Sequence, residues 1–345
     1  LILRIQTLLE TYQEAGGDNP VLLFHDEQHG SDLIAAVSRF NSGLPVNVLP
    51  LSVYSPTLLG HEILLAAFAS GAASVRIQIS RNRIQEADAF RSQIALSNQL
   101  IEALGFNADF CSLIEEQDPD GFEQALARPF EPVARDKIAY SAVGGKREIV
   151  RSILLGLDKI APTPQEIIPL DSGSPYGQII IDAENCTLCL ACIGACPVNA
   201  LSDNPENPQV RFTEQACVQC GLCRSTCPEN VIQLQPRYNL QPSAMDNVVL
   251  NEEEPFHCTR CGKPFGTKAT VEHILSVLEK KHSMFQSEEQ ISVIKMCDDC
   301  RVITLAESSN DPFKQGERPR IRTTDDYIEE EKKSKSNNNP DDFIC

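Results

Sequence analysis

Long apolar runs and an excess of basic residues are both missing from this sequence. No apolar stretch reaches the length of about 18 residues that a membrane-spanning helix needs, and the longest candidate, around Ile63–Ala69, is too short. We therefore expect no transmembrane segment. The 345 residues include 30 Lys and Arg against 48 Asp and Glu, a net charge of −18. That charge argues against nucleic acid as a partner, because the phosphate backbone is itself an anion.

Cysteine is absent from residues 1–110, and twelve of the fourteen cysteines lie between Cys186 and Cys300, all in C-x2-C-type clusters. A disulfide framework would be spread more evenly and would suit a secreted chain. Metal ligation needs reduced thiols, so we expect a cytoplasmic location. The chain starts at Leu1 rather than Met, so we expect the natural N-terminus to be missing, which leaves open a lost targeting segment or a further domain.

Two of the cysteine clusters repeat one motif. Residues 186–197 read CTLCLACIGACP and residues 217–228 read CVQCGLCRSTCP, so each is C-x2-C-x2-C-x3-C-P. This spacing is typical of [4Fe–4S] ligands, and in a two-cluster ferredoxin the fourth cysteine of each run binds the other cluster. Zinc is the alternative, which the spacing disfavours because a zinc site does not need the fourth cysteine.

Crossed ligation of this kind predicts two clusters, each with three ligands from one run and one from the other. The predicted sets are Cys186, Cys189, Cys192 and Cys227 for cluster one, and Cys217, Cys220, Cys223 and Cys196 for cluster two. Both runs, within residues 176–240, resemble bacterial-type two-cluster ferredoxins. The resemblance implies an α+β domain with pseudo-two-fold symmetry, whose clusters are close enough for rapid electron hopping.

A third cysteine group follows. Cys258 and Cys261 stand in FHCTRCGKPF, which resembles a zinc knuckle, and Cys297 and Cys300 form a second C-x2-C pair. Two such pairs suit tetrahedral Zn²⁺ and predict a small zinc-ribbon-like unit, although their separation exceeds the commonest ribbon spacing. A mononuclear iron or [2Fe–2S] site and no metal at all are the alternatives. The adjacent His257 is an alternative ligand that four cysteines make unnecessary.

The N-terminal part has the pattern of an α/β fold with a mainly parallel sheet. Short apolar runs alternate there with stretches of helical periodicity, as in βαβ units. The expected strands are 21–24, 46–49, 74–79 and 108–114, and the expected helices are 1–15, 31–40, 56–69, 84–104 and 121–127.

This region also has a resemblance of its own. Residues 45–77 (PVNVLPLSVYSPTLLGHEILLAAFASGAASVRI) and 95–106 (ALSNQLIEALGF) resemble the delta subunit of methyl-viologen-reducing hydrogenase. That family couples hydrogenase or formate dehydrogenase electrons to heterodisulfide reductase-type partners, and its domain carries cysteines for a [2Fe–2S] centre. Because residues 1–110 contain none, the resemblance implies a docking or scaffold module that has lost its cluster.

The predicted organisation has five parts, which are an α/β docking domain at 1–130, a connector with one helix at 131–175, the two-cluster domain at 176–240, the zinc-ribbon-like unit at 255–305 and a disordered tail at 306–345. The tail is too polar to bury a core.

Three features outside the cysteine clusters call for an interpretation. The HDEQHG loop (His25, Asp26, Glu27 and His29) follows a strand, where α/β proteins place ligand sites, but we interpret it as a solvated loop. Cys111 is expected to be a buried thiol. Gly144-Gly145-Lys146 lacks the full spacing of a phosphate-binding loop, so we do not interpret it as a phosphate site.

These patterns together favour an electron-transfer iron–sulfur protein without catalytic residues, a subunit or accessory of a hydrogenase, formate dehydrogenase or heterodisulfide reductase-like complex. Its expected partners are redox proteins. One alternative is a flavin- or substrate-binding oxidoreductase whose active site precedes Leu1. The other is a redox-sensing regulatory or assembly protein.

Overall fold

The computed structural model describes residues 1–106, 109–130, 137–204, 207–281, 288–307 and 323–336. The chain divides into two compact units, Leu1–Glu253 and Glu254–Cys345. Among the described residues, none of the helices combines the length and the apolar character needed to cross a membrane.

The first unit begins with a four-stranded parallel sheet in the order β2-β1-β3-β4. Its strands are β1 (Val21–Asp26), β2 (Val48–Val53), β3 (Ser74–Gln78) and β4 (Cys111–Ile114). The α/β expectation is therefore confirmed. The second strand starts later than predicted because the N–H of Val48 donates to the carbonyl of Pro45 in a preceding turn.

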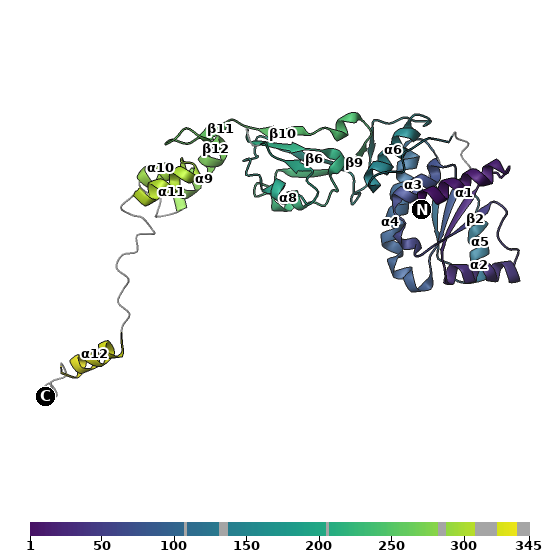
Figure 1. Cartoon of the computed structure of the whole chain (residues 1–345), viewed down its shortest axis with the longest axis horizontal. Helices are drawn as coiled ribbons and strands as arrows, with labels where there is room; N and C mark the ends of the chain where they lie inside the picture. The colour runs from purple at the N-terminus through teal and green to yellow at the C-terminus, as the bar shows by residue number, and fades with distance from the viewer. Residues whose placement is uncertain (107–108, 131–136, 205–206, 282–287, 308–322, 337–345) are drawn as a thin grey trace. The chain divides into compact units, whose positions relative to one another are not determined.

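Helices cover both faces of this sheet, which explains why β1 and β3 are apolar along nearly their whole length. Leu33 of α2 (His29–Phe40) and Phe122 of α5 (Pro119–Leu126) pack on one face. The other face is covered by α1 (Ile2–Glu14), α3 (His61–Ala69) and α4 (Ala87–Ala103) (Figure 1). The predicted helices 56–69 and 84–104 each begin as a 3₁₀ turn, Pro56–Leu58 and Arg81–Glu86, with Gly60 separating the first turn from α3.

Helix α6 (Lys146–Asp158), in the segment interpreted as a connector, belongs to the same core. Its Val150, Ile153 and Leu154 are fully buried in the cluster that contains α1, α3 and α4. Tyr176 and Tyr238 from the following domain join that cluster. The edge of the two-cluster segment therefore shares the hydrophobic core of the α/β fold, whereas the residues around its cysteines form a second cluster of their own.

Residues 167–252 form two small antiparallel sheets and two short helices. One sheet has the order β5-β9-β6 and the other β10-β8-β7. The elements are β5 (Ile167–Pro169), β6 (Gly177–Ile181), α7 (Ala191–Gly194), β7 (Leu201–Ser202), β8 (Gln209–Phe212), the 3₁₀ turn Glu214–Ala216, α8 (Leu222–Thr226), β9 (Ile232–Asn239), the 3₁₀ turn Pro242–Met245 and β10 (Val248–Glu252). Strands β5 and β7 have only three and two residues, too few for an alternating pattern to predict them.

The second unit opens with an antiparallel hairpin, β11 (Pro255–His257) and β12 (Pro264–Thr267). The helices α9 (Lys268–Lys281), α10 (Glu288–Ile294) and α11 (Asp298–Glu307) follow. Part of the tail that we expected to lack order is the helix α12 (Thr324–Ser336), whose first turn is closed when the N–H and hydroxyl of Thr323 donate to the Asp326 carboxylate. Residues 308–322 and 337–345, including Cys345, lie outside the described residues.

The shared core predicts a stability effect that two neighbouring leucines of α6 separate. Leu154 is fully buried, whereas Leu155 is 36% exposed. We expect Leu154→Ala to destabilise the first unit by about 2–5 kcal/mol, because it leaves a cavity in the common core. Leu155→Ala should change stability by less than about 0.5 kcal/mol. Thermal unfolding followed by circular dichroism measures both, and an equal effect of the two changes would contradict the shared core.

Candidate metal centres

The two cysteine runs fold into matching loops. Leu188 and Leu190 of the first run have positive φ angles of 49° and 60°, and Gln219 and Gly221 stand at the same positions of the second run with 53° and 78°. A left-handed backbone costs a leucine roughly 1–2 kcal/mol. Such strain concentrates at functional sites, and here three of the four left-handed positions carry it, because Gly221 adopts this backbone without steric cost.

The first run surrounds a small apolar cavity. Its own cysteines Cys186, Cys189 and Cys192 line this cavity, and the fourth thiol is Cys227, from the second run. Apolar side chains from the two sheets close the cavity, among them Ile181, Val210 and Ile232.

The second run surrounds a small apolar cavity in the same way. Cys217, Cys220 and Cys223 line it together with Cys196, from the first run. Each cavity is therefore lined by three cysteines of one run and one of the other, and the role of these residues as cluster ligands stays a prediction. Four thiols around a compact apolar cavity fit an iron–sulfur cubane in their number and chemical type.

Comparison with known families supports this interpretation. Residues 178–228 match the family model described as "4Fe-4S dicluster domain". The match includes both runs, and it confirms a ferredoxin-type iron–sulfur domain with an electron-transfer role. No curated protein matches the chain, so the resemblance of the α/β part to a hydrogenase subunit remains a prediction.

Burial raises the pKa of three thiols in the dicluster domain and so disfavours their ionisation. It raises the pKa of Cys192 to about 12, with Cys186, Cys189 and Cys223 acting in the same direction. Burial also raises the pKa of Cys217 and of Cys223. Four thiolates in so small a space require the positive charge of bound metal, and metal binding releases their protons.

Amide groups of the dicluster domain point at two of the sulfur atoms. The N–H of Ala200 donates to Cys196 Sγ at 3.3 Å. Gln219 donates to Cys217 Sγ from its backbone N–H at 3.5 Å and from its side-chain Nε2 at 3.4 Å. Hydrogen bonds to cluster sulfurs are one of the factors that set a reduction potential.

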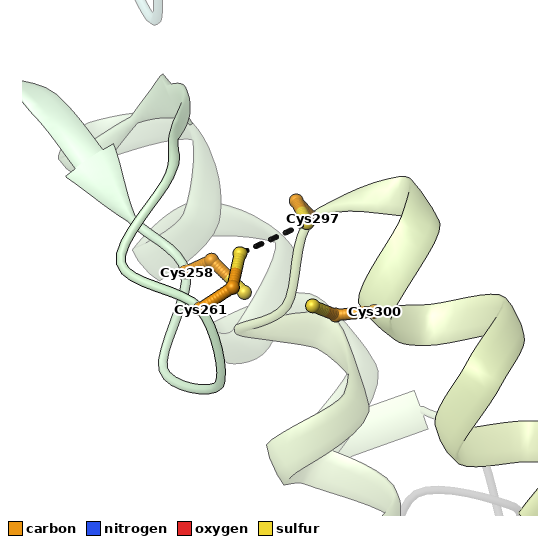
Figure 2. A group of neighbouring side chains, drawn as sticks. All are labelled: Cys258, Cys261, Cys297 and Cys300. Atoms are coloured by element: carbon orange, nitrogen blue, oxygen red, sulfur yellow. Dashed lines mark hydrogen bonds between the residues drawn. The ribbon is translucent and has the colours of Figure 1, made fainter.

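The second unit brings its four cysteines together. The sulfur atoms of Cys258, Cys261, Cys297 and Cys300 all lie within 4.8 Å of one another, and Cys261 Sγ is 3.7 Å from Cys297 Sγ (Figure 2). Cys258 and Cys261 flank the turn after β11, which Gly262 closes with φ = 74°. Cys297 and Cys300 lie at the start of α11. In the unit that we predicted to be ribbon-like, the second cysteine pair therefore lies at a helix start. His257 is exposed and is not a member of this group.

Opposing effects act on the thiols of this group. Burial disfavours ionisation of Cys258, but hydrogen bonds from the backbone of Cys297, Cys261 and Arg260 outweigh it and lower its pKa to about 6. Burial, with hydrogen bonds among the neighbouring thiols, raises the pKa of Cys300 to about 12. The backbone N–H groups around Cys258 therefore favour the thiolate form of this residue.

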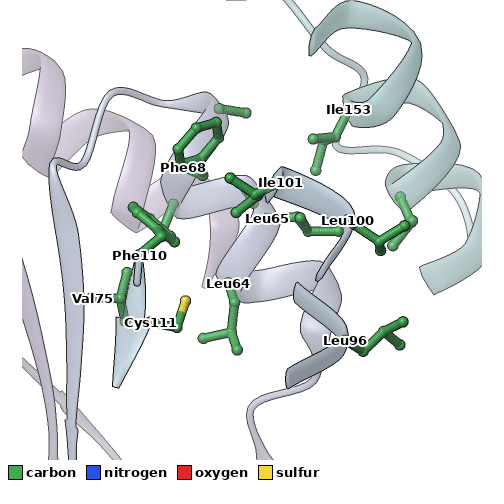
Figure 3. Close-up of a cluster of buried hydrophobic side chains, with 14 of the residues drawn as sticks. Leu64, Leu65, Phe68, Val75, Leu96, Leu100, Ile101, Phe110, Cys111 and Ile153 are labelled. Atoms are coloured by element: carbon green, nitrogen blue, oxygen red, sulfur yellow. The ribbon is translucent and has the colours of Figure 1, made fainter. Parts of the chain in front are cut away.

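The remaining residues singled out from the sequence have structural roles. The Asp26 carboxylate accepts the N–H groups of Gln28 and Gly30 at the start of α2. Asp26, Glu27 and His29 border a surface hollow at the carboxyl edge of the sheet. Among the described residues, however, the HDEQHG loop contributes no group of side chains close enough to hold an ion. Cys111 is directed into the apolar cluster around Phe68 and Phe110 (Figure 3), and burial raises its pKa.

Sequence reasoning missed Arg147, which follows the Gly-Gly-Lys segment that we set aside as a phosphate loop. This segment is the start of α6. From there the Arg147 guanidinium donates to the carbonyls of Pro175, Gln215 and Cys217 at 2.7, 2.7 and 3.0 Å. No local pattern signals this role, because the three acceptors lie far along the chain.

The loop geometry predicts that Gly177 of β6 is needed for the dicluster domain to retain its metal. A Cβ at Gly177 would clash with the backbone carbonyl of Gln235 and lie 2.7 Å from Cδ of Gln219. We expect Gly177→Ala to cost about 1–3 kcal/mol and to lower the iron content of the purified protein. Gly194→Ala is the control, since a Cβ at Gly194 meets no atom within 4 Å. Iron content and melting temperature measure both, and an unaltered Gly177→Ala protein would contradict this geometry.

Proposed function

We propose that this protein carries single electrons between redox partners through two [4Fe–4S] clusters with crossed ligands. Cys186, Cys189, Cys192 and Cys227 hold cluster one, and Cys217, Cys220, Cys223 and Cys196 hold cluster two. The observation that carries the proposal is the arrangement of the thiols, because each cavity is lined by one complete set. The family match over residues 178–228 supports it independently.

When bound, each cluster would accept and release one electron without making or breaking a covalent bond. The side chains around it position and insulate it. Ile179, Leu201 and Phe212 line cavity two, as Ile181, Val210 and Ile232 line cavity one. This apolar lining limits the access of water and so influences the potential. The role needs no side chain as acid, base or nucleophile.

We further propose a structural Zn²⁺ ion held by Cys258, Cys261, Cys297 and Cys300. Zinc–sulfur bonds of about 2.3 Å in a tetrahedron place neighbouring sulfurs about 3.8 Å apart. The distance of 3.7 Å between the sulfurs of Cys261 and Cys297 agrees with this value. Three of the four residues are buried, as in a closed structural site, and the ion would join the hairpin to α11.

The α/β fold is proposed as the docking module for a cytoplasmic oxidoreductase of the hydrogenase, formate dehydrogenase or heterodisulfide reductase type. Tyr54 and Leu58 near the carboxyl edge of the sheet are 83% and 69% exposed, and exposed apolar side chains of this size are common in protein interfaces. Because α6 shares a core with the dicluster domain, a partner bound to the α/β fold would be held in a defined position relative to the clusters.

Metal analysis of the anaerobically purified chain tests the cofactor assignment. We expect eight iron, eight sulfide and one zinc per chain, with reversible reduction by one electron per cluster. An iron and sulfide count near four would refute the two-cluster assignment. A flavin that co-purifies with the chain would point instead to an oxidoreductase with a catalytic site.

Crossed ligation is tested by exchanging the fourth cysteine of each run for alanine. Cys227→Ala should remove about half of the iron and expose Cys186, Cys189 and Cys192 to alkylation. Cys196→Ala should expose Cys217, Cys220 and Cys223 instead. Mass spectrometry after brief alkylation identifies the modified cysteines. If each run bound its own cluster, the two variants would show the opposite patterns.

A further inference from the structure

The two loops of the dicluster domain are not equivalent at the third residue of each run. In the second run this residue is Gln219, whose Nε2 donates to Cys217 Sγ at 3.4 Å and to the carbonyl of Gln178 at 3.0 Å. In the first run the same position holds Leu188, which is 4% exposed and lines cavity one. A leucine side chain has no N–H group, so at this position the second run has a side-chain donor to a ligand sulfur and the first run does not.

The position of the Gln219 amide is defined by its surroundings. Its second acceptor, the carbonyl of Gln178, belongs to β6. The preceding residue of that strand is Gly177, where any side chain would overlap the amide of Gln219. The strand therefore leaves room for this side chain and holds it beside Cys217.

The residue after each Cys-Pro pair differs in charge. Glu229 follows Cys227-Pro228 and lines cavity one. Its counterpart after Cys196-Pro197 is Val198, which lines cavity two. Only the first of these two positions carries a carboxylate.

A cation lies on the backbone of the second loop. Arg147 donates to the carbonyls of Gln215 and Cys217, and its guanidinium lies 4.3 Å from the ring centroid of Tyr176. Of the nearby charges, Glu214 is paired with Arg237 at 2.7 Å. The Glu214–Arg237 pair carries no net charge, so Arg147 leaves a positive charge beside this loop.

Reduction adds a negative charge to a cluster. A hydrogen-bond donor on a ligand sulfur and a nearby cation stabilise the reduced form, whereas a carboxylate destabilises it. We propose that Gln219 and Arg147 on one side, and Leu188 and Glu229 on the other, give cluster two the higher reduction potential. This inference rests on the proposed function. It gives the electron a direction, since one electron leaves reduced cluster one and reduces cluster two, with no proton transferred and no bond broken.

The first test exchanges the side chains at the third position of the two runs, Gln219 and Leu188. The full chain, purified anaerobically, is reduced stepwise at controlled potential while electron paramagnetic resonance follows each cluster. We expect two separate waves. Gln219→Leu should lower the upper wave and Leu188→Gln should raise the lower wave, each changing the electron partition between the clusters about tenfold, or about 59 mV for one electron. A single wave in the unaltered protein, or a Gln219→Leu change confined to the lower wave, would overturn the inference.

Arg147 has a matched control one helical turn further along α6. Arg151 also donates to three backbone carbonyls, those of Asn239, Leu240 and Gln241, none of them in a cysteine run. Arg147→Gln should lower the upper wave and Arg151→Gln should move neither. Equal effects of the two variants would overturn the role of Arg147, and if Arg147→Gln does not fold, the Gln219→Leu result decides the order of the potentials.

The same samples separate the two proposals. Eight iron atoms and two cluster signals with the reverse order of potentials would overturn only the inference. An iron count near four in the unaltered chain would overturn the proposed function as well.

Discussion

The fourth cysteine of each run lines the cavity of the other run, and the rest of the dicluster domain depends on this arrangement. Two loops that lie apart in sequence have to fold face to face. The strands β6 and β9 and the strands β7 and β8 make this possible, since each pair joins a segment near the first run to one near the second. The left-handed residues Leu188, Leu190 and Gln219 are the local cost of turning both loops toward their cavities.

The α/β fold and the dicluster domain are held together by more than their order in the chain. Helix α6 contributes its apolar face to the common core and its Arg147 to the second cysteine loop. Beside it, His61 Nε2 lies 2.6 Å from the hydroxyl of Tyr176, and burial lowers the pKa of His61. A buried polar contact of this kind is specific in geometry. Movement of the α/β fold relative to the second loop would therefore have to break packing and hydrogen bonds together.

A pseudo-symmetric domain with two identical sites would offer no direction to an electron. Here the backbones of the two cysteine loops are closely similar, as their matching φ angles show, while the side chains around the two sites differ. Gln219 and Arg147 on one loop and Leu188 and Glu229 on the other differ in the same electrostatic sense. The proposed carrier would thus combine a symmetric ligand framework with an asymmetric environment, and the cluster with the higher potential would be the one whose loop α6 contacts.

The sequence by itself determined that the chain has an iron–sulfur domain and an α/β fold. Thiolate spacing is a local property, so the two C-x2-C-x2-C-x3-C-P runs were enough to predict the dicluster domain. The alternation of apolar runs likewise predicted a parallel sheet, because the pattern reflects which faces of each element are buried. Element ends were less accurate, as at Val48 and Gly60, where a turn or a glycine outweighed the periodicity.

Only the tertiary structure decided how these parts cooperate. Whether α6 packs as core or belongs to a linker depends on its contacts with residues far away in the chain, and composition does not encode such contacts. The same holds for Arg147, whose three carbonyl partners are brought together by the fold, and for Cys297 and Cys300, whose position at a helix start is invisible in their spacing. Short segments of sequence determine the spacing of the cysteines. The electrostatic difference between the two loops, by contrast, arises only when distant segments pack around them.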